Sequence, residues 1–173
     1  MNMLFDKSTI IISGAVVVKE DKGKDQWLLV KQTEGAEWEF SKSVVRKGES
    51  SVRTAIRVMS EKGGMSTRVL EEVGRINGTV SNGGKTNSQK TIYYLMLLRS
   101  NPKEIIGFND FYWGDYAQVL KKLSSKKEQG MLKDAKLVYK DWKKNKKAKF
   151  DEQEALLLEE SLEQERLANL KVI

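Results

Sequence analysis

The first part of the chain alternates apolar runs with turn residues. Residues 10–18 form an apolar, β-branched run that is interrupted at Ser13 and Gly14, and residues 27–30 form a second apolar run. The stretch 21–25 between them is polar and contains a glycine, which is typical of a turn. We therefore predict one or two buried strands over 10–18 that form a hairpin with a strand over 27–30.

The clearest helical pattern lies between residues 50 and 64. Four apolar residues recur there at i, i+3, i+4 and i+7, which is the spacing of one helix face: Val52, Ala55, Ile56 and Met59. Ser50 or Ser51 can cap the start of this helix, and Gly63 with Gly64 can end it.

The second half of the chain predicts a long hairpin followed by helices. Residues 70–80 and 90–98 read as strands that are joined by the turn-forming residues 81–84. Residues 93–98 are apolar at every position, so we expect a central strand. Helices are predicted over 116–122, 129–142 and 151–170. Asp151 and Glu154 have the spacing of a capping box at the start of the last of these helices.

Composition removes several kinds of chemistry. The 173 residues contain no cysteine and no histidine, which excludes disulfides, thiolate or imidazole metal sites and His-dependent triads. No apolar run has the length of a membrane span, and residues 1–6 do not resemble a signal peptide, so we expect a cytoplasmic protein. The length indicates one domain over residues 1–142 and an extension over residues 143–173, which we interpret as a Lys-rich linker and an acidic C-terminal helix.

Charge is unevenly distributed. Residues 120–149 contain twelve lysines and three acidic residues, whereas residues 150–173 contain seven acidic residues and two basic ones. A cluster of lysines interleaved with aromatic rings is suited to neutralising phosphates and stacking bases. Six residues are candidates for contacting RNA, the ribosome or a protein partner: Lys140, Trp142, Lys143, Lys144, Lys146 and Lys147. The alternative is a solubilising helix face on which the acidic tail folds back.

Residues 43–65 have the spacing of a known signature: Gly, five residues, Glu, seven residues, Arg-Glu, an aliphatic residue, any residue, Glu-Glu, any residue, Gly, an aliphatic residue. Six positions match without a gap: Glu49, Arg57, Met59, Glu61, Gly64 and Met65. The lead-in Trp38 to Lys42 also resembles the Trp-x-Leu-Pro-Lys that precedes this signature. The chain thus resembles the Nudix hydrolases over roughly residues 10–140. The resemblance implies an α/β fold with a mixed β-sheet sandwiched between helices, here with a charged C-terminal helical extension.

Three positions depart from the signature. Ser43 replaces its first glycine, Val58 replaces a glutamate, and Lys62 replaces the second glutamate of the pair. In the family, carboxylates at positions 58, 61 and 62 converge on one point of the helix and bind Mg²⁺ or Mn²⁺, which need oxygen ligands. Only Glu61 remains here, so we expect no bound metal, with Glu61 as the ligand if there is one. Glu49 and Glu61 are the residual catalytic candidates.

Other residues of this region have two interpretations each. Candidates for binding phosphate or substrate are Lys42, Arg46, Arg57 and Lys62. Arg57 can instead be an internal strut that pairs with Glu49, and Glu61 can simply be the partner of a neighbouring cation. Trp38 and Trp113 can stack a base or pack in the core.

These observations leave three functional hypotheses. The first is a Nudix-fold protein that has lost metal-dependent pyrophosphohydrolase activity and binds a nucleotide, RNA or a protein. The second is an active hydrolase of nucleoside diphosphate-linked substrates with a non-standard Mg²⁺ or Mn²⁺ site, completed by Glu71, Glu72 or Glu104. The third is an RNA- or ribosome-associated protein in which the fold is only a scaffold.

Overall fold

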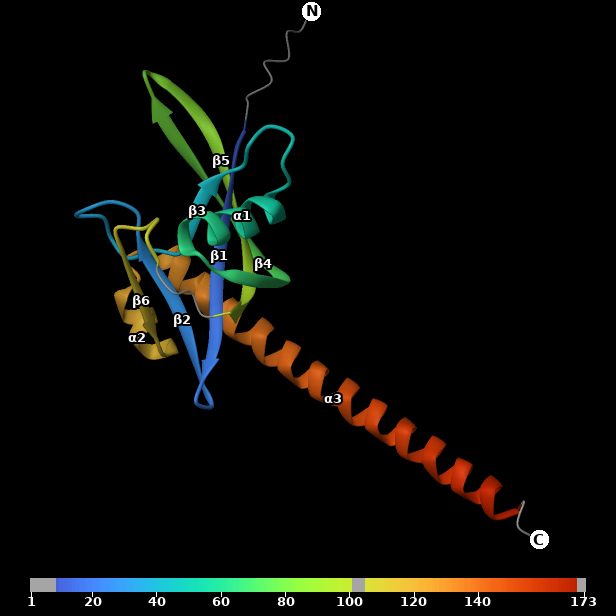
Figure 1. Cartoon of the computed structure of the whole chain (residues 1–173). Coiled ribbons are helices and arrows are strands. Elements are labelled where there is room, and N and C mark those ends of the chain that lie inside the picture. Colours follow the sequence, from blue (N-terminus) through green and yellow to red (C-terminus); the bar gives the residue numbers. More distant parts are fainter. Residues whose placement is uncertain (1–8, 101–104, 171–173) are drawn as a thin grey trace, which may run out of the picture. The chain divides into compact units, whose positions relative to one another are not determined.

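The computed structural model describes residues 9–100 and 105–170 (Figure 1). Glu104 and residues 1–6 therefore lie outside the described residues. The chain divides into two compact units, Met1–Val138 and Tyr139–Ile173, and each is considered by itself.

The first unit is built on a six-stranded mixed sheet. Its strands are β1 (Ile10–Asp21), β2 (Lys24–Lys31), β3 (Ser41–Val44), β4 (Ser66–Asn82), β5 (Lys85–Ser100) and β6 (Asp110–Gly114). The strand order is β4-β5-β1-β2-β6, and β3 pairs with β1 outside this path. The β1–β5 pair is parallel, and the other pairs are antiparallel.

The predicted strands are confirmed, with longer bounds. Strand β1 runs through Ser13 and Gly14 without a break and forms the expected hairpin with β2. Strands β4 and β5 form the long hairpin, which turns at Gly83 and Gly84, where φ is positive. Strand β5 lies between β4 and β1, as its continuous apolar run predicts.

Helices cover both faces of this sheet. Successive residues of a strand point to opposite faces, and Tyr93 and Tyr94 of β5 show which helix lies on each. The Tyr94 hydroxyl contacts Ser51 of α1 (Ser51–Gly63), whereas the Tyr93 hydroxyl contacts Glu128 of α3 (Lys126–Leu170). The short helix α2 (Tyr116–Lys122) follows β6. The fold class expected from the sequence is therefore confirmed.

The apolar face of α1 differs from the expected one. Ile56 is 42% exposed, whereas Val58 is 4% exposed and packs in the core with Ala55 and Met59. The other residues of the predicted face, Val52, Ala55 and Met59, do pack on the core, so the face is rotated slightly toward Val58 and away from Ile56. The burial of Val58 matters for the chemistry, because the signature has a glutamate at this position.

Helix α3 also corrects the sequence interpretation. It is continuous from Lys126 to Leu170, so residues 143–150 are helical and Asp151 does not begin a helix. Residues 131–170 contain no glycine or proline to interrupt the helix. A tail that folds back on the lysine cluster would need a break between them, and α3 has none.

Candidate functional site

Helix α1 is positioned by well-formed ends. Ser50 caps its start by accepting a hydrogen bond from the Arg53 backbone N–H at 3.3 Å. Gly64 ends it in the left-handed conformation, with φ of 59°, and its N–H bonds back to the last turn. The loop before the helix turns through Arg46 and Glu49, so Glu49 lies beside the first turns of the helix.

Arg57 holds both carboxylates that remain from the signature. Its Nε and Nη2 donate to the two Glu49 oxygens at 2.9 and 3.2 Å, and its Nη1 donates to Glu61 at 3.3 Å. These hydrogen bonds to Arg57 hold the pKa of Glu49 below its ordinary value, and Glu49 in turn raises the pKa of Arg57. The geometry is that of the internal strut, and it uses three N–H groups of the guanidinium on protein carboxylates.

The two other positions of the expected metal cluster carry no oxygen ligand. Val58 is buried, and the Lys62 ammonium donates to the Gln32 side-chain oxygen at 3.3 Å. That ammonium also lies 5.9 Å from the centre of the Phe108 ring. Lys62 is thus bound among protein groups on the side of α1 where the family has a carboxylate.

The donor set does not fit a divalent ion. Within residues 9–100 and 105–170, no three acidic side chains come together in a geometry that could hold a metal. The two surviving carboxylates share one arginine, and hard cations such as Mg²⁺ favour several free oxygen ligands.

An open cleft of about 390 Å³ lies along the exposed side of α1. Its lining consists of Glu49, Arg53, Ile56, Arg57, Ser60 and Glu61. Sequence reasoning did not select Arg53, because the signature has no fixed residue at that position. Arg53 and Arg57 give the cleft two cationic groups beside two carboxylates.

Lys42 lies in a separate cluster on the α3 side of the sheet. Its ammonium contacts Glu39 at 2.9 Å and Glu128 at 3.1 Å, and Glu128 also accepts a hydrogen bond from the Tyr93 hydroxyl at 2.9 Å. We call Glu39, Lys42, Tyr93 and Glu128 the Glu128 cluster. The Lys42 ammonium is therefore engaged in this cluster, although Gln32 connects the Lys42 backbone oxygen to the Lys62 ammonium. Arg46 is exposed in the loop before α1.

Burial shapes the protonation of the Glu128 cluster. It raises the pKa of Glu128, which is 3% exposed, despite the neighbouring Lys42. Burial also raises the pKa of the Tyr93 hydroxyl. Burial lowers the pKa of Lys42, but the carboxylates of Glu128 and Glu39 together outweigh this effect and leave the Lys42 pKa above its ordinary value. No sequence pattern predicts this cluster, since Glu128 lies among lysines.

Trp38 and Trp113 are both half-buried and lie under lysine side chains. Trp113 packs against the core on the α1 side, with the Lys19 ammonium 4.2 Å from its ring centre. Trp38 lies beside Tyr112, with ring centres 6.0 Å apart. The lysines Lys31 and Lys122 approach the Trp38 ring at 5.0 and 5.5 Å.

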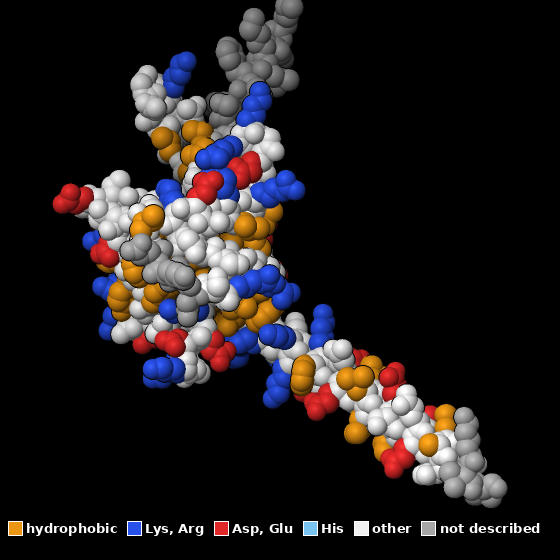
Figure 2. Space-filling model, viewed as in Figure 1, with side chains coloured by type: hydrophobic (Ala, Val, Ile, Leu, Met, Phe, Trp, Pro, Cys, Tyr) orange, Lys and Arg blue, Asp and Glu red, His pale blue; other side chains and the backbone are white. Residues whose placement is uncertain are grey.

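The second unit presents the predicted partner-binding residues on one helix. Lys140, Lys143, Lys144, Lys146 and Lys147 are exposed, and Trp142 is half-buried. The rings of Tyr139 and Trp142 stack with centres 6.0 Å apart and planes 12° from parallel. The ammonium groups of Lys143 and Lys146 lie 4.5 and 5.2 Å from these two rings. Figure 2 shows basic side chains on the early turns of the long helix and acidic ones farther along it.

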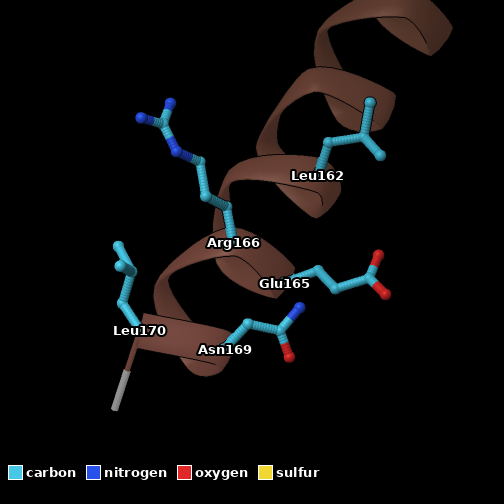
Figure 3. A pocket seen from close by; sticks show the side chains of 5 residues that line it. All are labelled: Leu162, Glu165, Arg166, Asn169 and Leu170. Atoms are coloured by element: carbon cyan, nitrogen blue, oxygen red, sulfur yellow. The ribbon is translucent and has the colours of Figure 1, made fainter. Parts of the chain in front are cut away.

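The acidic end of the second unit also has a hollow of about 490 Å³. It lies between the side chains of Leu162, Glu165, Arg166, Asn169 and Leu170 (Figure 3). All five come from α3, so a single helix forms its wall. A ligand pocket usually encloses most of its ligand, and this surface does not.

Comparison with known structures bears on the first unit. An Ap4A hydrolase from C. elegans, in a binary complex, superposes with a TM-score of 0.64 at 17% identity, covering 76% of this chain and 98% of that one. The Nudix domain of Shewanella oneidensis NrtR, complexed with ADP ribose, gives a TM-score of 0.62 at 17% identity, covering 79% and 92%. The chain has the Nudix fold. The MutT protein from Methanosarcina mazei Go1 agrees, with a TM-score of 0.60 at 16% identity and coverage of 76% and 96%.

Sequence comparison adds nothing to this assignment. No family model matches the chain, and no curated protein matches it. The assignment of the Nudix fold therefore rests on the similarity of the backbone structures. The sequence identities are low, so they show the fold alone. In the described part of the chain, no helix is long and apolar enough to cross a membrane.

Proposed function

We propose that this Nudix-fold protein has lost metal-dependent pyrophosphohydrolase activity and binds the phosphate groups of RNA through the basic part of α3. The observation that carries the loss is the strut: Arg57 engages both Glu49 and Glu61. Arg57 engages both oxygens of Glu49 and one oxygen of Glu61, and Val58 and Lys62 offer no further oxygen ligands beside them.

A direct test of this loss is Mn²⁺ binding, followed by electron paramagnetic resonance. We expect the free Mn²⁺ signal to be unchanged by the protein at millimolar metal. Mn²⁺ uptake by the native chain that disappears in Glu61→Gln would contradict the proposal. Lys143→Gln is the matched control, because it changes one charge in the second unit and leaves α1 intact.

The binding part of the proposal rests on charge and exposure. Lys140, Lys144 and Lys147 are exposed at i, i+4 and i+7, so they share one face of the helix. Lysines neutralise phosphates as point charges and do not read bases, so we expect binding that is independent of sequence. The Tyr139 and Trp142 rings stack at the start of this surface, and two further ammonium groups lie against them.

The experiment is fluorescence anisotropy with a labelled RNA duplex and a single strand, at several salt concentrations. We expect affinity to fall steeply with salt and to be weakened on both probes when Lys143, Lys144, Lys146 and Lys147 are all changed to Gln. Four lost contacts should reduce the slope of log affinity against log salt by about 3 on the single strand. A variant that binds both probes like the native chain would refute RNA binding by this segment. Free nucleotides and isolated ribosomes, added as competitors, would show which phosphate source is preferred.

A second candidate remains an active hydrolase of a nucleotide. The cleft on α1 supports it, because Arg53 and Arg57 line it together with Glu49 and Glu61. The similar structures suggest the substrates to test, since one is an Ap4A hydrolase and another is complexed with ADP ribose.

A further inference from the structure

Two aromatic rings and two lysines gather where β6 meets α2, in the first unit. The rings of Trp38 and Tyr112 have centres 6.0 Å apart and planes tilted by 58°. The Lys122 ammonium lies 4.6 Å from the centre of Tyr112 and 5.5 Å from that of Trp38, and the Lys31 ammonium lies 5.0 Å from Trp38. We call these four residues the Trp38–Tyr112 cluster.

The backbone holds the two rings in place. A bridge between Val30 and Glu39, with N–H···O distances of 2.9 and 3.1 Å, fixes the segment that carries Trp38 against the end of β2. Tyr112 pairs with Leu29 in the sheet, and its ring covers Gly114 so closely that a side chain there would overlap it. Tyr112 and Trp113 are neighbours on one strand, so Tyr112 points to the face opposite the α1 core.

The chemistry of this cluster matches an unpaired base with its phosphates. Aromatic rings stack on bases of any sequence, and such stacking is worth more than a cation–π contact at an exposed site. A base that displaces Lys122 from the rings would therefore gain more than it loses, and it would free an ammonium group for the adjacent phosphate. A duplex offers no such base, because its bases are already stacked inside the helix.

We propose that the Trp38–Tyr112 cluster stacks one base of single-stranded nucleic acid, while Lys31 and Lys122 hold the flanking phosphates. This second site deepens the RNA binding proposed above: it adds a preference for single strands, which the lysines of α3 by themselves do not provide. It rests on residues of the first unit only.

The test compares a labelled 12-nucleotide oligouridylate with a 12-base-pair RNA duplex, by anisotropy on the full chain. We expect Trp38→Leu to weaken binding of the single strand by about tenfold and to leave duplex binding unchanged. Trp38→Phe should restore most of the affinity, because a ring is kept. Lys122→Gln should weaken single-strand binding too, whereas its matched control Lys19→Gln, at the equivalent contact on Trp113, should not.

The outcomes separate this proposal from the previous one. If folded Trp38→Leu, checked by its thermal melt, binds oligouridylate like the native chain, the base-stacking site is refuted. Equal losses on both probes would also refute it, because a stacking site acts only on unpaired bases. The variant with four Lys→Gln changes in α3 should lose affinity for both probes to a similar extent. Native protein that binds the duplex but shows no preference for the single strand would overturn the stacking site and leave α3 binding intact.

Discussion

Truncation of Glu128 should destabilise the first unit strongly, and replacement by Gln should not. The Glu128 side chain accepts from the Tyr93 hydroxyl and the Lys42 ammonium at 2.9 and 3.1 Å, and the residue is 3% exposed. Glu128→Ala leaves the hydroxyl without an acceptor and the ammonium with Glu39 alone. Removing one member of a buried pair costs about 3–5 kcal/mol, and because Lys42 keeps Glu39 we expect about 3 kcal/mol.

Glu128→Gln is the informative partner of this change. The raised pKa of Glu128 means that its surroundings favour the neutral carboxyl, and a Gln oxygen can still accept from Tyr93. The loss of attraction to Lys42 is then offset by a smaller desolvation cost, so we expect the free energy of unfolding to fall by under about 1 kcal/mol.

The assay is urea unfolding followed by tryptophan fluorescence at neutral pH. With a slope of about 2 kcal/mol per molar urea, the midpoint should fall by roughly 1.5 M for Ala and under about 0.5 M for Gln. Glu39→Gln, at the exposed side of Lys42, is the matched control and should cost less than Glu128→Ala. Equal losses for the Ala and Gln variants would refute the reasoning.

The same pair of proteins reports the pH dependence. A carboxyl whose folded pKa is raised binds more protons in the folded state, so its contribution to stability is complete below its ordinary pKa and is lost as pH rises through the folded pKa. Native protein should therefore gain stability relative to Glu128→Gln as pH falls from 7 toward about 4.5. A gap that does not change with pH would contradict the raised pKa.

Three further predictions concern α1 and its surroundings. Hydrogen bonds from Arg57 lower the pKa of Glu49, so the stability that Glu49 contributes should be present above its ordinary pKa and be lost as pH falls through the folded pKa. A carboxyl titration by NMR in which Glu49 shows an ordinary midpoint would disprove this. Val58→Glu should destabilise by at least about 2 kcal/mol, since residue 58 is 4% exposed in an apolar core, and an unchanged thermal midpoint would contradict that burial. Gly107→Ala should cost about 1–3 kcal/mol in urea unfolding, because its Cβ would collide with the backbone of Lys62, and a silent substitution would show that this loop can move away.

The sequence predicted the fold well because its signals are local. Runs of β-branched residues, the Gly83-Gly84 turn and the capped helix after Ser50 each specify one element, and the order of elements matched the Nudix arrangement. Ile56 was wrongly placed on the buried helix face, and the burial of Val58 was not predicted, because spacing alone cannot say how a helix is rotated against its sheet. The break expected before Asp151 was wrong because a capping pattern inside a good helical sequence does not stop the helix.

The candidate site was predictable only in part. Spacing to the signature identified Glu49, Arg57 and Glu61, and the strut between them was one of the two interpretations. Contacts between distant segments could not be predicted from the sequence. Lys42 and Glu128 are far apart in sequence, and neither belongs to a pattern that would indicate a contact with the other. Trp38 was selected, but Tyr112 was not linked to it, because only the sheet register brings the two rings together.

The central claim is tested most directly by turnover of the native chain. Phosphate release would be measured with diadenosine tetraphosphate, ADP-ribose, nucleoside triphosphates and capped RNA, with Mg²⁺ and with Mn²⁺, beside Glu61→Gln as the matched variant. The strut between Arg57 and the two carboxylates predicts rates for both proteins that equal the protein-free blank. The account would be contradicted if the native chain releases phosphate in a metal-dependent way and Glu61→Gln abolishes this release. Glu61 would then have to release Arg57 and take part in hydrolysis.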